Sequence, residues 1–207
     1  MLTKILCISG SPVDGSSTDF ILRELSRQIS NKFNTNKTSI EFIKLSELKL
    51  YSCIACGKIP EKNFCIYDDD ISPIYNKIIE CDCFLFGSPI YFDSVSAQAK
   101  TLIDRCNCMR PPDYENQTPN HDFMKILTKK RPGAIILVGG EKAWFEGARR
   151  TIAGFFKWIE VINEGLITYG SHDFKKKGDA VNDLHVLRNI NNLAEHLYEK
   201  ILNDEKV

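Results

Sequence analysis

Short apolar runs recur at intervals along the chain. Each is about four to eight residues long and is bounded by glycine, proline, serine or charged residues, a pattern typical of buried β-strands. The run at 39–45 alternates apolar and polar residues, so one face of that strand is expected to be less buried. Asn163 and Gly165 weaken the last run. The predicted strands are residues 4–9, 39–45, 83–88, 134–140 and 162–168.

Between the runs, apolar residues return every three or four positions, as they do on one face of a helix. Strands that alternate with helices favour right-handed crossovers and a parallel sheet with helices on both faces. The pattern therefore predicts the α/β class, with about five strands and five helices. The predicted helices are residues 18–32, 71–80, 94–106, 145–158 and 181–202.

Two stretches do not follow the alternation. Residues 49–70 are irregular and contain three cysteines, and residues 110–132 are polar and proline-rich, as in a loop excursion. Neither stretch has the character of a linker that divides the chain, and no internal repeat is present. We therefore expect one domain over residues 1–207.

Composition narrows the function. The chain has 207 residues and equal numbers of basic and acidic side chains, 27 of each, which argues against a dedicated nucleic-acid binder. No apolar run reaches the roughly 18 residues of a membrane span, and the N-terminal segment does not have the pattern of a secretory signal. A cytoplasmic protein is expected, in which the eight cysteines are thiols and mostly small core residues.

Three strand ends carry unusual sequence. In an open parallel sheet, ligands bind at the carboxyl ends of the strands, where the strand order reverses. The segments 9–18, 88–94 and 139–147 each follow a predicted buried strand. We expect these three segments to converge on one site.

The first segment, SGSPVDGSST at 9–18, is rich in hydroxyls and small residues and leads into a helix. Backbone N–H groups, hydroxyls and the helix dipole together bind phosphate at such a position. The segment has neither the GxxxxGK[ST] nor the GxGxxG pattern, and no lysine that would clamp a nucleotide. An uncharged cradle suits a monophosphate that stays bound, such as that of FMN. The alternative is a hydroxyl-rich helix cap and turn.

The second segment, at 88–94, places Ile90, Tyr91 and Phe92 beyond the sheet end, in a loop stiffened by Pro89. Apolar and aromatic side chains there would form a wall for a planar ring. The alternative is a hydrophobic plug under the following helix.

The third segment, GGEKAWFEG at 139–147, begins with paired glycines, which allow close approach of the backbone to a ligand. Trp144 and Phe145 would either pack beside a ring or join the core.

These three loops, in this order, resemble those of the flavodoxin-like NAD(P)H-dependent FMN reductases, and within them the iron–sulfur flavoprotein group. The resemblance extends over residues 2–170 and is most specific at 9–18 and 87–105. It implies a flavodoxin-like three-layer fold, a five-stranded parallel sheet of order 2-1-3-4-5, noncovalent FMN, and homodimers that often pair into homotetramers.

The resemblance also assigns cofactor-binding roles by position, with Tyr91 nearest the flavin ring. The chain departs from the family at Asp93, where relatives often have glycine, and at Trp144-Phe145, where a second glycine pair is common. The implied positions are Ser9, Ser11, Ser16, Ser17 and Thr18 for the phosphate, Pro89, Ile90, Tyr91 and Phe92 for the isoalloxazine, and Gly139 and Gly140 in the third loop.

Cys53, Cys56 and Cys65 lie where the iron–sulfur relatives carry a compact four-cysteine motif, but Ile59 takes the third position. Three thiolates are one short of the Cys₄ set of a [4Fe–4S] cluster, and zinc would also need a fourth ligand, with no histidine nearby. We expect no iron–sulfur cluster. The favoured interpretation is a vestigial or structural cysteine loop, or a thiol pair, bordering the active site. The four histidines are expected at the surface, without carboxylate or cysteine partners at ligand spacing in the sequence.

The sequence thus predicts an FMN-dependent oxidoreductase that reduces a small acceptor, such as a flavin, a quinone or a nitroaromatic, with NAD(P)H by ping-pong hydride transfer. No catalytic acid or base is assigned. The alternative is an electron-transfer protein that passes electrons through FMN between redox partners. Acidic excess usually steers the docking of such carriers, and zero net charge weakly favours the enzyme. A flavodoxin-like binding module without cofactor is a third interpretation.

Overall fold

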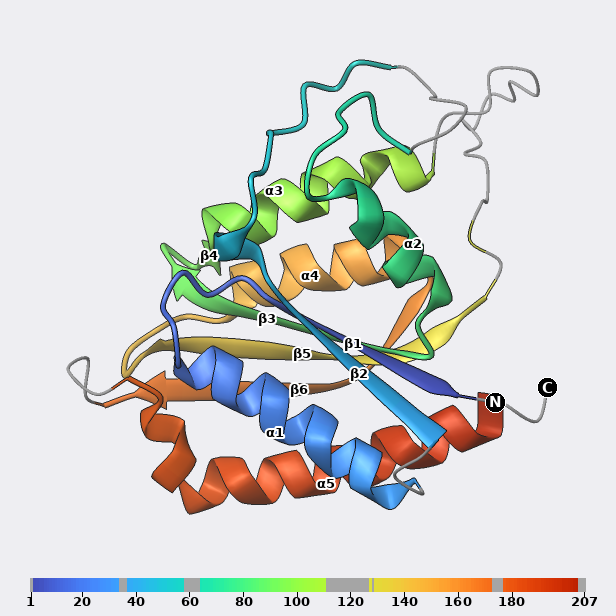
Figure 1. Ribbon diagram of the computed structural model, residues 1–207. Helices are drawn as coiled ribbons and strands as arrows, with labels where there is room; N and C mark the ends of the chain where they lie inside the picture. Colours follow the sequence, from blue (N-terminus) through green and yellow to red (C-terminus); the bar gives the residue numbers. More distant parts are fainter. Residues whose placement is uncertain are drawn as a thin grey trace.

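The sheet has six strands, one more than expected: five are parallel, in the order β2-β1-β3-β5-β6, and the short sixth strand pairs antiparallel with β3. The computed structural model describes residues 2–33, 37–57, 64–110, 127, 129–172 and 177–204. The flavodoxin-like fold and the strand order 2-1-3-4-5 expected from the sequence are confirmed (Figure 1). The strands are β1 (Thr3–Ser9), β2 (Thr38–Lys44), β3 (Cys83–Tyr91), β5 (Arg131–Gly140) and β6 (Val161–Ser171).

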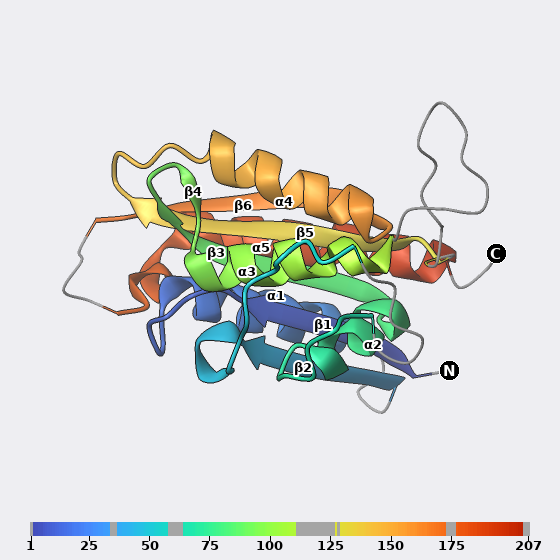
Figure 2. The same ribbon diagram turned by 90° about the horizontal axis from the view of Figure 1, so that it is seen from above.

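Helices cover both faces of the sheet (Figures 1 and 2). On one face lie α1 (Ser17–Lys32) and α5 (Leu184–Asp204), and on the other lie α2 (Ser72–Glu80), α3 (Ala97–Arg105) and α4 (Glu146–Trp158). Successive side chains of a strand point to opposite faces, so each strand contributes to two cores. In β1, Ile5 packs with α1 and α5, whereas Leu6 packs with α2, α3 and α4.

The first six residues of the central strand β3 are all buried. Its residues Phe84 and Phe86 are inaccessible to solvent and pack against the rings of Phe155 and Phe156 on α4, with ring centroids 5.5–6.1 Å apart and mostly edge-to-face. Edge-to-face contacts add to the free energy gained by burying the rings. This aromatic cluster fixes α4, and with it the third loop, over the centre of the sheet.

One predicted helix begins later than expected. After Tyr91 the chain turns back and forms β4 (Ser94–Val95), which pairs antiparallel with the end of β3, Ile90 opposite Val95. The helix predicted from residue 94 therefore starts only at Ala97, where the Ser96 hydroxyl caps it by accepting from the Ala99 N–H. The pairing of Val95 with β3 keeps it out of the helix.

The other boundaries differ by a few residues. Strand β5 starts at Arg131, inside the predicted excursion 110–132, because the fully buried Arg131 donates to the carbonyls of Ile78 and Lys129. Residues 111–126 and 128 of that excursion lie outside the described residues. Short 3₁₀ turns occur at η2 (Leu45–Glu47), η3 (Cys106–Met109) and η4 (Asp179–Asn182). In the described part of the chain, no helix combines the length and hydropathy that a membrane crossing requires.

Candidate functional site

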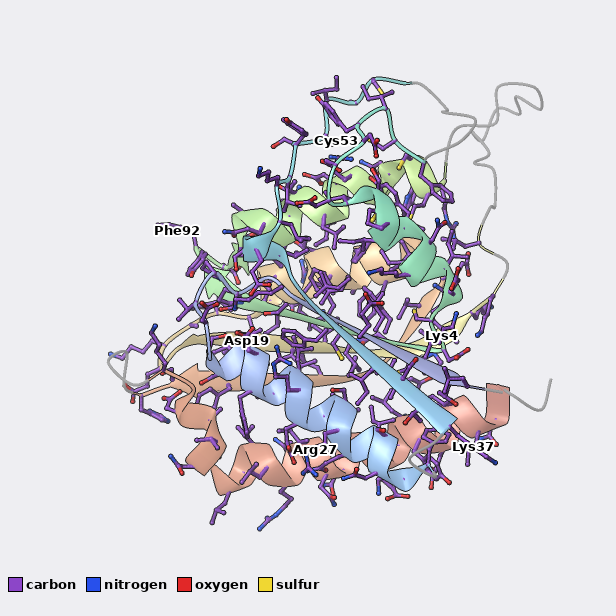
Figure 3. All side chains as sticks on the ribbon, in the orientation of Figure 1. Lys4, Asp19, Arg27, Lys37, Cys53 and Phe92 are labelled. Atoms are coloured by element: carbon purple, nitrogen blue, oxygen red, sulfur yellow. The ribbon has the colours of Figure 1, made fainter. Side chains whose placement is uncertain are left out.

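The sheet brings the ends of β1, β3 and β5 together. Ser9 lies opposite Gly87 and Pro89 opposite Val138, so the three unusual segments leave the sheet at one edge. Hydrogen bonds join the first two: the Gly10 N–H donates to the Gly87 carbonyl at 2.8 Å. In Figure 3, Asp19 and Phe92 lie toward one end of the sheet and Lys4 toward the other.

Most hydroxyls of the first loop are hydrogen-bonded within the protein. The Ser16 hydroxyl caps α1 by accepting from the Asp19 N–H at 3.2 Å. The others act as donors: Ser9 to the Asp19 carboxylate at 2.5 Å, Ser11 to the Val13 carbonyl at 3.3 Å, and Ser17 to the Asp179 carboxylate at 2.7 Å.

The backbone at the start of α1 remains suited to an anion. The N–H groups of Ser17 and Thr18 precede the first helical carbonyl they could bond to, and the helix dipole adds positive potential there. Gly15 approaches this turn with a left-handed φ of 66° and no neighbour where a Cβ would be. Thr18 is buried and directs its methyl group toward β3. The loop therefore fits a phosphate through N–H groups more than through hydroxyls.

A buried ion pair lies beneath this loop. Lys44 Nζ, from the end of β2, is 2.6 Å from Asp19 Oδ2, and each side chain is only 6% exposed. The same ammonium donates to the Val13 carbonyl at 2.9 Å. The loop therefore rests on a pair of opposite charges, which the expectation of an uncharged cradle did not include. The sequence did not reveal this pair, because Lys44 comes close to the loop only where the pairing of β1 and β2 places it opposite Ser9.

The second loop is a strained hairpin with exposed rings. Phe92 and Asp93 both have left-handed φ angles, 52° and 56°, as a two-residue hairpin turn requires. Asp93 adopts the conformation that glycine takes most easily. Phe92 is fully exposed (Figure 3). Tyr91 is 46% exposed, so neither ring forms a plug under the helix. Ile90 does pack against the core.

The third loop separates its two aromatic residues. Phe145 packs against the core, whereas Trp144 is 78% exposed. The Ala143 N–H closes a turn on the Gly140 carbonyl at 2.9 Å. A Cβ on Gly139 would lie 2.2 Å from the Cβ of Ala143, so the turn itself requires a glycine here, independently of any ligand.

In the described part of the cysteine loop, the three thiols are not grouped as metal ligands. Cys53 Sγ accepts from the Ala55 N–H at 3.4 Å, Cys56 is exposed, and Cys65 packs inward against the core. Within the described residues, no three histidine, cysteine, aspartate or glutamate side chains are placed to hold a metal ion. Ile59 lies outside the described residues. A cluster bound by four thiolates does not fit three cysteines arranged in this way.

The other five cysteines behave as core residues. Burial raises the pKa of Cys7 to about 12, of Cys81 to about 11 and of Cys108 to about 12. It also raises the pKa values of Cys83 and Cys106 well above the usual range. Thiols with such values are unreactive at neutral pH. These side chains pack as the sequence predicted.

A second buried ion pair holds the cysteine loop against α3. Arg105 Nη1 lies 2.6 Å from Asp69 Oδ2 and donates to the Tyr51 carbonyl at 2.8 Å, and both charged side chains are almost inaccessible. Burial by itself would raise the pKa of Asp69, but hydrogen bonds from Arg105 and from the backbone lower it. Sequence reasoning missed this pair, which joins positions far apart in the chain.

Two of the described histidines lie near a carboxylate, which their spacing in the sequence did not indicate. His196 Nε2 lies 2.8 Å from Glu164 Oε2, a carboxylate partner contributed by the facing strand β6. His172 approaches Glu141 at 3.8 Å, and both side chains are exposed. His121 lies outside the described residues.

The strand order and the helices on both faces define a flavodoxin-like α/β protein, in which the loops after β1, β3 and β5 leave the sheet at one edge. Residues 3–163 match the NADPH-dependent FMN reductase family. The chain belongs to this family, whose members are flavoprotein oxidoreductases.

The chain is similar to two iron-sulfur flavoproteins of Methanocaldococcus jannaschii. One is 30% identical over 96% of this chain and 97% of the relative, and the other is 32% identical over 95% and 98%. Among solved structures, the azoreductase of Bacillus anthracis superposes with a TM-score of 0.67 at 14% identity, covering 96% of this chain and all of that one. At that identity the likeness shows the fold alone.

Proposed function

We propose that the protein is an FMN-dependent oxidoreductase that uses NAD(P)H to reduce a small acceptor, such as a flavin, a quinone or a nitroaromatic, in ping-pong order. One observation carries the proposal. In a member of the FMN reductase family, the start of α1 and the exposed ring of Tyr91 belong to loops that leave the sheet at the same edge.

The chain's own residues would bind and orient a noncovalent FMN. The N-terminal N–H groups of α1 would take the phosphate, and the second loop would take the ring, with Tyr91 nearest to it. The proposed contacts are Ser9, Ser11, Ser16, Ser17 and Thr18 for the phosphate, Pro89, Ile90, Tyr91 and Phe92 for the ring, and Gly139 and Gly140 in the third loop.

Bound FMN would supply the ring that takes a hydride from the nicotinamide and returns electrons to the acceptor. The Ser9 and Ser17 hydroxyls already donate to carboxylates within the protein, so their main role would be to hold the shape of the loop. Rotation of the Ser11 and Ser16 hydroxyls would let them donate to a phosphate. We assign no acid or base to the protein.

We further propose that the chain works as one domain, as a homodimer or homotetramer in the cytoplasm, without nucleic-acid or membrane partners. The eight cysteines are all free thiols, which suits a reducing compartment. The proposed oligomer follows the family resemblance, and sedimentation velocity measures it directly.

An anaerobic titration tests the function. The purified protein should show a flavin spectrum or take up FMN, and riboflavin, which lacks the phosphate, should bind at least about tenfold more weakly. NADH or NADPH should then bleach the bound flavin rapidly. Protein that binds no FMN would overturn the proposal. Bleaching by a reduced protein donor but not by NAD(P)H would identify an electron carrier instead.

A further inference from the structure

A single side chain ties the second loop to the third. Asp93 Oδ1, in the β3–β4 turn, accepts a hydrogen bond from the Gly147 N–H at 3.1 Å, although the two residues are 54 positions apart. Their backbones touch as well: a Cβ on Gly147 would lie 2.1 Å from the Asp93 carbonyl oxygen. The two loops therefore meet at a contact that leaves no room for another side chain at position 147.

The contact replaces a helix cap that α4 lacks. Helix α4 begins at Glu146, and its N-cap residue is Phe145, which makes no side-chain capping bond. A carboxylate near a helix N-terminus satisfies a free N–H group and interacts favourably with the dipole. Asp93 provides that carboxylate from another element, so α4 is capped by the β3–β4 turn.

Asp93 holds this position against a conformational cost. Its φ of 56° follows the φ of 52° at Phe92, and glycine would adopt either value with less strain. The Asp93–Gly147 bond therefore joins a turn of unfavourable backbone conformation to the start of a helix whose N-cap residue, Phe145, makes no side-chain capping bond.

We propose that Asp93 is a positioning residue that holds residues 141–146 against the β3–β4 turn. Phe92 and Trp144 then form an exposed aromatic rim, and the acceptor is a planar aromatic molecule that stacks on it. The inference rests on the proposed function. It is supported by the exposure of both rings, by the strain in the turn, and by the tendency of aromatic side chains to stack on planar groups.

Three substitutions separate the cap from the strain. Asp93→Gly relieves the left-handed strain and removes the cap, whereas Asp93→Asn tolerates the conformation and keeps an acceptor oxygen. Asp93→Ala removes the cap and keeps the strain. Asp183→Gly is the matched control, because Asp183 accepts from the Val186 N–H at the start of α5.

Amide exchange in the ligand-free protein tests the tether without any activity. The Gly147 N–H should exchange at least about tenfold faster in Asp93→Gly than in the wild type, and close to the wild-type rate in Asp93→Asn. In Asp183→Gly its rate should not change. Equal Gly147 exchange rates in the wild type and in Asp93→Gly would overturn the tether.

Steady-state kinetics test the acceptor. The measured quantity is the ratio of KM for a naphthoquinone to KM for ferricyanide, an acceptor without an aromatic ring. Asp93→Gly and Trp144→Ala should raise this ratio about tenfold, and Asp93→Asn should keep it at the wild-type value. Asp183→Gly should leave that ratio unchanged. If Trp144→Ala leaves the ratio of the two KM values unchanged, the aromatic rim does not bind the acceptor. If the substitution instead dissociates an oligomer, the rim is an interface between subunits, and the proposal is also overturned. If the wild type takes up no FMN, the proposed function fails, and the exchange rates still decide the tether.

Discussion

Lys44 and Asp19 form a buried ion pair that joins the ends of β2 and α1 beneath the first loop. Asp19 also accepts from the Ser9 hydroxyl at the end of β1, and Lys44 donates to the Val13 carbonyl within the loop. Two opposite charges thus connect three elements of the fold. The pair fixes the shape of the loop to which we assign phosphate binding.

Replacing Lys44 by methionine should strongly destabilise the protein. The substitution leaves the Asp19 carboxylate buried without its cation, a loss that typically costs about 3–5 kcal/mol. Urea denaturation measures the change in the free energy of unfolding. FMN affinity should also fall, because the Val13 carbonyl loses its donor and the loop loses its shape.

Lys100→Met is the control for this prediction. Lys100 pairs with Asp104 on the exposed surface of α3, and removing such a pair changes stability by only about 0.5 kcal/mol. The double substitution Asp19→Asn, Lys44→Met should recover part of the stability lost in Lys44→Met, since no buried charge is left unpaired. If Lys44→Met and Lys100→Met lower the free energy of unfolding by similar small amounts, the buried pair contributes little to stability.

Gly139→Ala should destabilise the protein and disturb the third loop. The new methyl group would meet the Cβ of Ala143 at 2.2 Å, so the turn closed by the Gly140 carbonyl must shift. Overpacking of this kind costs about 1–3 kcal/mol. Gly154→Ala, on α4 with open space at its Cβ, should instead stabilise by about 0.4–1 kcal/mol. The thermal midpoint should therefore fall in Gly139→Ala and rise in Gly154→Ala. A rise in both variants would contradict the clash at Gly139.

The predictable part of the fold is local in sequence. The runs at 4–9 and 83–88 are bounded by turn residues and correspond to β1 and the first part of β3, because a strand buried on both faces must be apolar throughout. Strand β4 has two residues, too few to show any period, and it displaced the predicted start of α3. The convergence of the three loops was predictable from the alternation of strands and helices, whereas the strand order was predictable only from the family resemblance.

The unpredicted part of the site consists of long-range polar contacts. Lys44, Arg105 and Asp93 each reach partners that only the register of the sheet or the packing of loops brings near. A charged residue in a sequence is ordinarily a solvated one, and no periodicity marks the few that are buried. For the same reason the hydroxyls at 9–18 indicated a ligand site but not their internal bonds.

The stability contributed by Asp69 should depend on pH. Its folded-state pKa lies below the ordinary value of 3.8, because Arg105 and backbone N–H groups stabilise the charged form. The contribution is therefore fully present above the unfolded-state pKa and is lost as the pH falls through the lowered folded-state value. Asp69→Asn should lower the free energy of unfolding by about 3–5 kcal/mol at neutral pH.

The difference between the wild type and Asp69→Asn should shrink below about pH 4. Urea denaturation at about pH 7, 5 and 3.5 measures it. Asp104→Asn, which removes an exposed carboxylate on α3, should show a small and nearly constant difference over the same range. A difference for Asp69→Asn that stayed constant down to about pH 3 would show that the carboxylate is not held in its charged form.

Ile59→Cys should test whether the cysteine loop lacks only one ligand. The wild type has Cys53, Cys56 and Cys65 in this loop, and a [4Fe–4S] cluster normally takes four thiolates, so anaerobic reconstitution of the wild type should leave little iron or sulfide. In the Ile59→Cys variant the spacing becomes CxxCxxC followed by a fourth cysteine, and about four iron and four sulfide per chain are expected. Ile59→Ser is the control, because it changes polarity without adding a thiolate.

Iron and sulfide in the reconstituted wild type at the level expected for Ile59→Cys would mean that another group completes the site. An Ile59→Cys variant that stays free of iron would mean that the inward packing of Cys65 keeps the four thiolates apart.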